Sequence, residues 1–502
     1  MISLHALAKK MGVICVGKNI PLAGVTLDSR QVKVGYLYIA IKGSVADGHD
    51  YIGAAINNGA VAVVCENKNS LLASGLPGWS SALLKTEISR LACEVYQHPT
   101  EQLSVLGITG TNGKTSISYY LLQAIRALGD QCGQIGTLGL QLEDEVVVTQ
   151  NTTPDACTLQ HFFSDALHSD TRFVAMEVSS HALDQGRVEG VNFSTAVFSN
   201  LTHDHLDYHI SMDAYFEAKA SLFKVQSLQA AVVNIDDKYG QALLRLLSGH
   251  EYKLLSYSMK SEWADVYANN IRITAVGVSF DIRYKSKKYT IQTQLIGKFN
   301  ISNLLAVVAV LLANNFKLEE IIQCLSSIKP VRGRMEIVEN TQSILALVDY
   351  AHTPDALKNV LHAAQEYMFL QKEINPDAKL ITVFGCGGDR DLTKRAVMGK
   401  VVETLSDITI VTADNPRSES QAVIAANIIE GFSTDQYVQI DDRKAAIQYA
   451  VDHANSGDVI VVAGKGHEDY QLIGDEVLFF SDAECLSSLL RSKAQTLGGR
   501  HV

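Results

Sequence analysis

The chain has 502 residues, of which 47% are hydrophobic, and its formal net charge at pH 7 is −11. This length and composition predict about three globular domains, each large enough for its own core. The acidic balance and the lack of a long basic tract argue against a nucleic-acid groove or an anionic membrane surface as partner. We therefore expect no nucleic-acid partner and no stable membrane insertion.

The cysteines and the N-terminus bear on the compartment. Eight cysteines are widely spaced and none forms a Cys-x-x-Cys pair. This argues against a zinc ribbon or a disulfide framework and favours a reducing compartment. Residues 1–16 are interrupted by His5, Lys9 and Lys10, and the longest apolar run, residues 304–313, is too short to cross a bilayer. We expect a cytoplasmic protein.

Residues 1–98 are predicted to form a small N-terminal α/β domain. Short apolar strands are expected at residues 36–41 and 61–65, alternating with helical stretches. The pattern ends at His98-Pro99, where we place the first domain boundary.

Residues 99–330 are predicted to form a central domain with a doubly wound, P-loop ATPase-like parallel sheet. A strand beginning at Leu103 precedes a glycine-rich loop and a helix over 116–128, and further buried strands are expected at 173–178 and 195–200. Residues 254–296 show alternating strand patterns, which predict an antiparallel insertion.

The strand and helix pattern restarts after Lys329-Pro330, so residues 331–502 are predicted to form a C-terminal, Rossmann-like α/β domain. Its strands are expected at 344–348, 380–384, 408–411 and 459–462, separated by helices. The fold class is therefore α/β, in three domains.

The run GITGTNGKT over residues 107–115 indicates a phosphate-binding loop. Glycines at 107, 110 and 113 are expected to let backbone N–H groups fold around phosphate oxygens, while Lys114 supplies a charge and Thr115 a hydroxyl for Mg²⁺. The strict Walker spacing places a glycine at 108, where this chain has Ile108. The loop predicts an ATP-using enzyme; the alternative is a plain glycine-rich turn.

Glu177 ends a predicted buried strand, where polar side chains reach the ligand crevice of an α/β sheet. We expect its carboxylate to hold Mg²⁺ opposite Thr115. The alternative is a glutamate that caps the following helix.

Residues 200–209, NLTHDHLDYH, contain the densest group of metal-competent side chains. The spacing from His203 to His209 is HxHxDxH, one residue longer than the HxHxDH of dinuclear metallo-hydrolases, which disfavours that class. We expect one hard cation, bound by His205, carboxylates and nucleotide phosphates.

Eleven motifs that occur in order carry a family resemblance. They are GITGTNGKTS (107–116), NTTP (151–154), EVSSHALDQGR (177–187), NLTHDHLDYH (200–209), YFEAKASLF (215–223), GKFNISN (297–303), GRME (333–336), DYAHTP (349–354), GCGGDRD (385–391), DNPR (414–417) and GKGHE (464–468). Together they resemble the Mur ligases over essentially the whole chain. In this family the first loop glycine lies one residue earlier than in the strict Walker form, as Gly107 does here.

The resemblance implies an ATP-dependent ligase of peptidoglycan synthesis. A carboxylate is a poor acyl donor, so ATP first converts it to an acyl phosphate that an amine then attacks. By resemblance, Lys114, Glu177, His205 and Lys219 are catalytic. Mg²⁺ would be held by Thr115, Glu177, His205 and Lys219 as a carbamate. ATP would contact Gly107, Thr109, Gly110, Thr111, Asn112, Gly113, Lys114, Thr115, Asn303 and Arg334. Without the motif, Lys219 would be interpreted as a solvated helix lysine.

The resemblance also implies both remaining substrates. UDP-N-acetylmuramoyl-L-alanyl-D-glutamate would be bound by Leu27, Ser29, Asn151, Thr152, Thr153, Ser179, Gln185 and Arg187. meso-2,6-Diaminopimelate would be bound by Arg390, Asp414, Asn415, Pro416, Arg417, Gly464 and Glu468. Lysine lacks one carboxylate of diaminopimelate, and a guanidinium binds a carboxylate bidentately, so Arg417 favours the latter.

Other functions share part of this pattern. A folylpolyglutamate synthetase or the D-alanyl-D-alanine-adding Mur ligase would share the loop, but neither is expected to carry both DNPR and GKGHE. A regulatory nucleotide switch would leave the third domain's motifs unexplained. We also expect a monomer whose third domain swings toward the centre when ATP and substrate bind.

Overall fold

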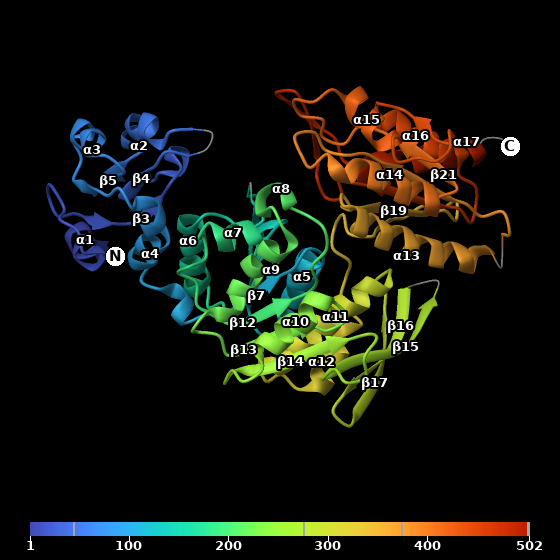
Figure 1. Ribbon diagram of the computed structural model, residues 1–502, viewed down its shortest axis with the longest axis horizontal. Helices are drawn as coiled ribbons and strands as arrows, with labels where there is room; N and C mark the ends of the chain where they lie inside the picture. Colours follow the sequence, from blue (N-terminus) through green and yellow to red (C-terminus); the bar gives the residue numbers. More distant parts are fainter. Residues whose placement is uncertain (44–45, 150, 275–276, 373–374, 499–502) are drawn as a thin grey trace.

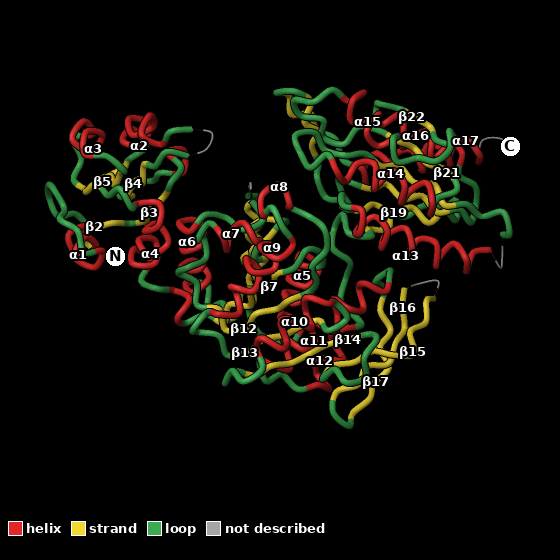
Figure 2. Tube along the Cα trace, in the orientation of Figure 1, coloured by secondary structure: helices red, strands yellow, loops and turns green. Residues whose placement is uncertain are grey.

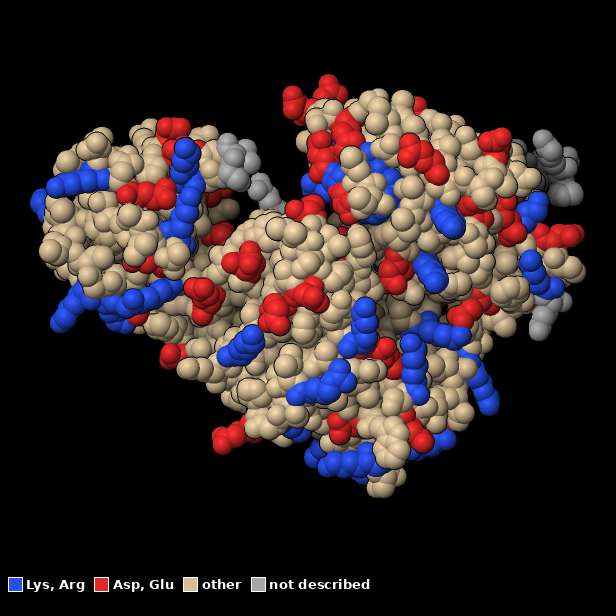
Figure 3. Space-filling model, in the orientation of Figure 1, with Lys and Arg blue, Asp and Glu red and all other residues tan. Residues whose placement is uncertain are grey.

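The computed structural model describes residues 1–43, 46–149, 151–274, 277–372 and 375–498, so the predicted domain end at 502 lies outside it. The backbone forms three lobes in chain order, from the blue N-terminal lobe to the orange and red third lobe (Figure 1). The molecular surface is hollowed between the first and third lobes (Figure 3). The predicted α/β class is confirmed, since helices flank sheets in every lobe (Figure 2).

The N-terminal lobe contains a parallel sheet. Its strands, in spatial order, are β3 (Gly24–Thr26), β4 (Tyr36–Ala40), β5 (Ala60–Cys65) and β6 (Gly78–Ser80). Its helices are α1 (Leu4–Met11), α2 (Ile52–Asn57), α3 (Lys68–Ser74) and α4 (Leu84–Tyr96), and β1 (Ile2–Ser3) pairs with β2 (Pro21–Leu22). Leu37 and Ile39 face one core and Tyr36 and Tyr38 the other, because side chains alternate along a strand.

The central lobe is built on one continuous sheet of eleven strands in the described residues. In spatial order they are β10 (Glu145–Val147), β9 (Gly139–Leu142), β8 (Cys132–Gly136), β11 (Phe173–Glu177), β7 (Ser104–Thr109), β12 (Phe193–Phe198), β13 (Ala230–Asn234), β14 (Lys253–Ser258), β15 (Val266–Thr274), β16 (Gly277–Tyr284) and β17 (Lys287–Thr293). Helices α5 (Lys114–Ala127), α11 (Lys298–Ala313) and α12 (Leu318–Leu325) cover one face, and α6 (Ala156–His168), α9 (Met212–Ala220) and α10 (Lys238–Leu247) the other. The sheet is therefore doubly wound, as predicted.

Two expectations for this lobe need correction. Within residues 254–296 the pairs β15–β16 and β16–β17 are antiparallel, as predicted, but β14 runs parallel to β13 and all these strands extend the central sheet. Alternation in the sequence marks a strand with one buried face but not the direction of its partner. In addition, α5 begins at Lys114, two residues before the predicted start, because the loop leads directly into the first helical turn.

The third lobe has a six-stranded sheet in the described residues. Its spatial order is β18 (Glu336–Val338), β19 (Leu345–Asp349), β23 (Val459–Ala463), β20 (Leu380–Phe384), β21 (Ile408–Val411) and β22 (Val438–Gln439), with only β18 antiparallel. Helices α13 (Pro354–Lys372), α14 (Thr393–Leu405) and α15 (Gln421–Ile429) cover one face, and α16 (Arg443–His453) and α17 (Asp482–Gly498) the other. The predicted strands 380–384 and 408–411 match β20 and β21 to the residue.

Two further observations concern the whole described chain. All eight cysteines are free thiols, in line with the prediction of no disulfide framework. Across the described residues, no helix combines the length and apolar character needed to span a bilayer.

Candidate functional site

The glycine-rich loop joins β7 to α5 in a backbone conformation that only glycine adopts without strain at two positions. Gly110 and Gly113 have φ values of 148° and 88°. A Cβ at Gly110 would lie 1.9 Å from Oγ of Ser199, and one at Gly113 would lie 2.6 Å from Oδ1 of Asn303. Asn303, which is expected to contact ATP, thus packs against the loop itself.

Gly107 has a different role from the one expected. It lies inside β7, paired with Met176 of β11, and not in the loop. A Cβ there would lie 2.7 Å from the ring of Phe193. The glycine therefore permits close packing of β7 behind the loop and is not part of the loop itself.

Lys114 begins α5 and folds back over the loop. Its Nζ donates hydrogen bonds to the carbonyl oxygens of Gly110 and Thr111, at 2.9 and 2.8 Å. Burial lowers the pKa of Lys114, and the charges of Glu177 and Asp204 oppose that shift. The ammonium is thus held at the loop, where a nucleotide phosphate would be its natural partner.

Thr115 and Glu177 meet, as predicted. The Thr115 hydroxyl donates to Oε2 of Glu177 at 2.9 Å, and the backbone N–H of Thr137 donates to Oε1 at 2.8 Å. Burial raises the pKa of Glu177, opposed first by Lys114. The capping alternative for Glu177 is wrong, because Ser179 caps the helix α7 (Ser180–Asp184) by accepting from Ala182 N–H. Hydroxyl and carboxylate oxygens at a phosphate loop are the donor set that Mg²⁺ prefers, so the residues fit that ion.

Lys219, in α9, is not a solvated helix lysine. Its side chain is 1% exposed, and its Nζ donates to the carbonyl of Gly110 at 2.8 Å and lies 4.6 Å from the ring centre of Tyr215. Burial, reinforced by the charge of Lys114, holds the pKa of Lys219 well below its usual value. A lowered pKa favours the neutral amine, which is the form that reacts with CO₂, so the residue fits the implied carbamate.

The histidines of the HxHxDxH run do not gather around one point. His209 is buried and its Nε2 lies 2.9 Å from Oγ of Ser180, whereas Nε2 of His203 lies 3.9 Å from a carboxylate oxygen of Asp391 in the third lobe. Among the residues that the structure describes, no three His, Cys, Asp or Glu side chains form a group that could hold a metal. This geometry does not support a dinuclear hydrolase.

His205 has different partners from those of His203 and His209. It adopts a left-handed backbone conformation, with φ of 54°, and its Nε2 lies 3.4 Å from Oδ2 of Asp204. Burial lowers the pKa of His205 to about 4, although the Asp204 carboxylate opposes the shift. A neutral imidazole is the form that can bind a cation.

Four of the residues implied to bind the nucleotide-sugar peptide cluster beside Glu177. The Thr153 hydroxyl donates to the Glu177 carbonyl at 2.9 Å and accepts from the Ser179 N–H at 3.0 Å. Arg187 donates to the Thr153 carbonyl at 2.9 Å and to Oε1 of Gln185 at 3.0 Å.

The remaining members of this implied set lie directly before Thr153 in the chain or in the first lobe. Thr152 lies 3.2 Å from the Thr137 hydroxyl, so the cluster reaches the Glu177 carboxylate through Thr137. Asn151 is exposed. Leu27 and Ser29 lie just after β3 in the N-terminal lobe.

In the third lobe, Asn415 is the centre of a buried polar network. Its amide donates to Oε2 of Glu468 at 2.9 Å, and its Oδ1 accepts from Nζ of Lys465 at 3.2 Å and from the Leu472 N–H at 2.9 Å. Gly464 is next to Asp414, since a Cβ there would lie 2.4 Å from Oδ2 of Asp414.

Arg417 and Arg390 flank Gly387. A Cβ at Gly387 would lie 2.8 Å from Nη1 of Arg417 and 3.8 Å from Cγ of Arg390. Arg417 has a φ of 53° after the buried Pro416, and its Nη1 donates to the carbonyl of Gly388 at 2.9 Å. Arg390 is exposed. The Arg417 guanidinium therefore lies beside Gly387 and the Asn415 backbone, and the stem of the Arg390 side chain approaches the same glycine.

The third lobe contacts the phosphate loop directly. Arg334 donates to the Thr115 hydroxyl at 3.4 Å, and the Asn112 amide donates to Oδ2 of Asp355 at 3.0 Å. Further from the loop, the Tyr367 hydroxyl donates to the Gly277 carbonyl at 3.3 Å.

Several residues of the site were missed by the sequence reasoning. Lys465 and Tyr350 lie inside quoted motifs without an assigned role, and Asp355 directly follows one. Thr137 carries no local signal, because it is an isolated threonine that reaches Glu177 only through the fold.

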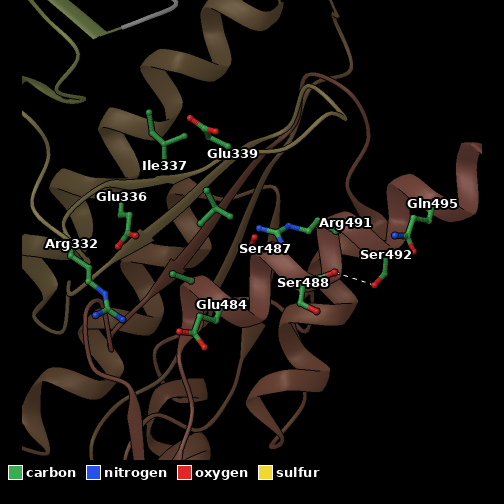
Figure 4. A pocket seen from close by; sticks show the side chains of 12 residues that line it. Arg332, Glu336, Ile337, Glu339, Glu484, Ser487, Ser488, Arg491, Ser492 and Gln495 are labelled. Carbon is green, nitrogen blue, oxygen red and sulfur yellow. Dashed lines mark hydrogen bonds between the residues drawn. The ribbon is translucent and has the colours of Figure 1, made fainter.

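A separate hollow of about 730 Å³ lies between β18 and α17 (Figure 4). Arg332 and Glu336 border it on one side and Arg491 on the other. It contains none of the residues proposed above for substrates.

A phosphate loop with oxygen donors for a cation, covered by a second α/β lobe that presents arginines, defines a nucleotide-dependent enzyme of the P-loop class. Family models match in chain order: "Mur ligase family, catalytic domain" over residues 21–105, "Mur ligase middle domain" over 108–311, and "Mur ligase, glutamate ligase domain" over 333–466. The chain belongs to the Mur ligase family and is a ligase.

Two relatives similar in sequence and one solved structure carry the same enzyme name. The chain is 41% identical, over 93% of each chain, to the UDP-N-acetylmuramoyl-L-alanyl-D-glutamate--2,6-diaminopimelate ligase of Listeria monocytogenes serotype 4b (strain F2365). It is also 41% identical to the ligase of that name from Caldanaerobacter subterraneus subsp. tengcongensis, over 94% of this chain and 95% of that one. A solved structure of a ligase of that name covers 98% of this chain and 99% of its own, with a TM-score of 0.67 and 31% identity.

Proposed function

We propose that this ligase uses ATP and Mg²⁺ to join meso-2,6-diaminopimelate to the D-glutamate carboxylate of UDP-N-acetylmuramoyl-L-alanyl-D-glutamate. The relatives' shared name supports these substrates. The observation that carries the proposal is the pairing of two sites in one molecule. Thr115 and Glu177 form an oxygen-donor pair at the loop, and the third lobe that contacts the loop holds Arg417 beside the Asn415 network.

The first step is phosphoryl transfer. A carboxylate oxygen of the acceptor attacks the γ-phosphorus of ATP, the bond to the bridging oxygen breaks, and ADP leaves, which gives an acyl phosphate. Lys114 and the N–H groups at the start of α5 offset the repulsion between the two anions. Mg²⁺, when bound by Thr115, Glu177 and His205, supplies further positive charge to the phosphate oxygens.

Lys219 has a supporting role in this step. As a carbamate it would carry a negative charge at the buried position beside Gly110, where burial already lowers the pKa of the free amine. Such an anion could hold a second cation, whereas an ammonium would repel it.

The second step is amide formation. The amine of the incoming amino acid attacks the acyl carbon, the C–O bond to phosphate breaks, and phosphate leaves with the electron pair while the nitrogen loses a proton. Arg417 would hold the distal carboxylate, and Glu468 and Asn415 would orient the amino end. The lobe that covers the loop excludes water, which would otherwise hydrolyse the acyl phosphate.

Phosphate release tests this function. Purified protein is incubated with MgATP, UDP-N-acetylmuramoyl-L-alanyl-D-glutamate and either meso-diaminopimelate or L-lysine. Released phosphate is measured, and the mass of the product is determined by mass spectrometry. We expect phosphate release, and a product heavier than the acceptor by one diaminopimelate less one water, only with diaminopimelate. Turnover with lysine would contradict the role of Arg417, and no turnover with either would contradict the substrates.

The cellular compartment and the oligomeric state are also part of the proposal. The free thiols favour the cytoplasm, where ATP is present. We propose a monomer, because one chain contributes both halves of the site; sedimentation velocity at working concentration would test this.

A further inference from the structure

Tyr350 lies between the phosphate loop and the amino-acid residues of the third lobe. It directly follows β19, and its ring packs against three side chains. The Cζ of Arg334 lies 4.6 Å from the ring centre, and the rings of His352 and His467 lie 4.8 and 5.2 Å away. Burial raises the pKa of Tyr350, so its hydroxyl stays protonated and able to donate.

The aromatic ring of Tyr350 supports the guanidinium of Arg334. Within the part of the chain that the structure describes, the buried Nε of Arg334 has no hydrogen-bond partner. Its Nη2 donates to the Thr115 hydroxyl at a long 3.4 Å. A guanidinium with so few hydrogen bonds depends on the aromatic face below it for its position.

The hydroxyl of Tyr350 points to the other site. It donates to Oε1 of Glu468 at 3.5 Å. The second oxygen of that carboxylate, Oε2, accepts from Asn415 at 2.9 Å and from Lys465 at 3.2 Å. Tyr350 therefore faces the one carboxylate oxygen that these two residues leave available.

Close backbone packing prevents Tyr350 from shifting alone. A Cβ at Gly466 would lie 2.7 Å from Cβ of Tyr350 and 2.6 Å from the carbonyl oxygen of Gly333. A Cβ at Gly333 would lie 2.0 Å from the backbone nitrogen of His467. The segments that carry Arg334, Tyr350 and Glu468 thus interlock, and a displacement of one moves the others.

We propose that Tyr350 is a positioning residue that couples the two substrate sites, with its ring setting Arg334 at the nucleotide and its hydroxyl setting Glu468 at the incoming amino acid. The identity of these two ligands rests on the proposed function. Because coupling between binding sites is reciprocal, a bound nucleotide that fixes Arg334 also favours the Glu468 geometry that receives the amino acid.

Two variants separate the two roles. Tyr350→Phe keeps the ring and removes the hydroxyl, so the KM for diaminopimelate should rise roughly tenfold while the KM for ATP changes by less than about twofold. Tyr350→Leu removes the ring as well, so the KM for ATP should rise and kcat should fall. Tyr449→Phe, on α16, is the matched control and should change neither. Equal effects of Tyr350→Phe on both KM values, or no effect, would overturn the proposal.

A binding measurement keeps this test independent of the proposed reaction. Calorimetric titration with Mg²⁺ and the non-hydrolysable analogue AMP-PNP needs no amino acid and no turnover. We expect Tyr350→Leu to weaken analogue binding and Tyr350→Phe to retain wild-type affinity, with thermal melting showing that both variants fold. Equal affinity of Tyr350→Leu and wild type would overturn the role of the ring, whereas wild-type protein that binds the analogue but releases no phosphate would count only against the proposed function.

Discussion

The Thr115 hydroxyl donates a hydrogen bond to the Glu177 carboxylate at 2.9 Å, and the two side chains are 4% and 1% exposed. Thr115 lies in the first turn of α5, and Glu177 ends strand β11. Two oxygen ligands are therefore placed together, out of contact with bulk water, at the edge of the phosphate loop.

Replacing Glu177 tests this pair. Glu177→Gln keeps the size of the side chain but removes the negative charge that a cation would need. We expect kcat to fall by about 100-fold or more, with melting temperature within about 2 °C of wild type. Activity should be measured across a Mg²⁺ titration. Glu189→Gln, at an exposed position, is the control, and similar losses in both variants would contradict a specific role.

Lys219 should be modified by CO₂ in the active protein. The lowered pKa of its buried amine favours the neutral form that can react with CO₂, whereas the guanidinium of Lys219→Arg cannot form a carbamate. We expect a carbamate carbon signal by NMR in protein equilibrated with carbon-13 bicarbonate, and loss of both signal and turnover in Lys219→Arg. Lys224→Arg, an exposed lysine just beyond α9, should retain both. Full activity of Lys219→Arg would exclude a catalytic carbamate.

Arg417 should set the choice of amino acid. Arg417→Ala leaves the distal carboxylate of diaminopimelate unpaired, so the ratio of kcat/KM for diaminopimelate over lysine should collapse, by up to roughly 10⁴-fold. Competition between the two amino acids, followed by product mass, measures that ratio. Arg491→Ala, exposed on α17, should leave it unchanged. An unchanged ratio in Arg417→Ala would assign selectivity elsewhere.

Acid should destabilise the fold partly through His352. Burial lowers its folded-state pKa to about 4, below its ordinary value of 6.5, so the folded state binds fewer protons than the unfolded chain between these values. Its contribution to the free energy of unfolding is complete above pH 6.5 and is lost as the pH falls toward 4. Burial raises the pKa of Asp349 to about 6, so Asp349 makes the free energy of unfolding change with pH in the opposite direction. The contribution of His352 must therefore be measured with a variant at that position.

Denaturant unfolding of His352→Asn across this pH range isolates the histidine. We expect the free-energy difference between wild type and variant to shrink as the pH falls from 6.5 to 4. His250→Asn, at an exposed position, should keep a constant difference from wild type. A constant difference for His352→Asn would show that the histidine titrates normally in the fold.

Asp355 should help to hold the third lobe on the loop, since it accepts the Asn112 amide at 3.0 Å. Small-angle scattering should show a larger radius of gyration for ligand-free Asp355→Ala than for wild type, and a decrease when Mg²⁺, AMP-PNP and acceptor are added. Asp377→Ala, at an exposed position, should match wild type. Unchanged dimensions on ligand addition would contradict the predicted swing of the third domain.

The strands most accurately predicted from sequence are the fully buried parallel ones, such as β20 and β21. Short runs rich in Ile, Val and Thr, each preceded by a charged residue, indicate both their type and their position. The placement of Gly107 within β7 could not be predicted, because a glycine at this position is compatible with either a strand or a loop. Its close packing against Phe193 becomes apparent only in the folded structure.

Contacts within the site that follow from neighbouring strand ends could be predicted from sequence, whereas contacts between distant segments could not. The meeting of Thr115 and Glu177 follows from adjacent strand ends in a parallel sheet. The divergence of His203 and His209 toward different partners depends on the short helix α8 (Leu206–His209) and on the third lobe. The contact of Arg334 with Thr115 joins residues far apart in the chain, and no local pattern encodes it.

Isotope transfer tests the central claim most directly. The acceptor is prepared with heavy oxygen in its D-glutamate carboxylate and incubated with MgATP and meso-diaminopimelate, and the released phosphate is analysed by mass spectrometry. Phosphoryl transfer to that carboxylate, followed by attack of the amine, predicts one heavy oxygen in each phosphate released. Phosphate that contains only light oxygen would contradict the acyl-phosphate route and the proposed ligase reaction with it.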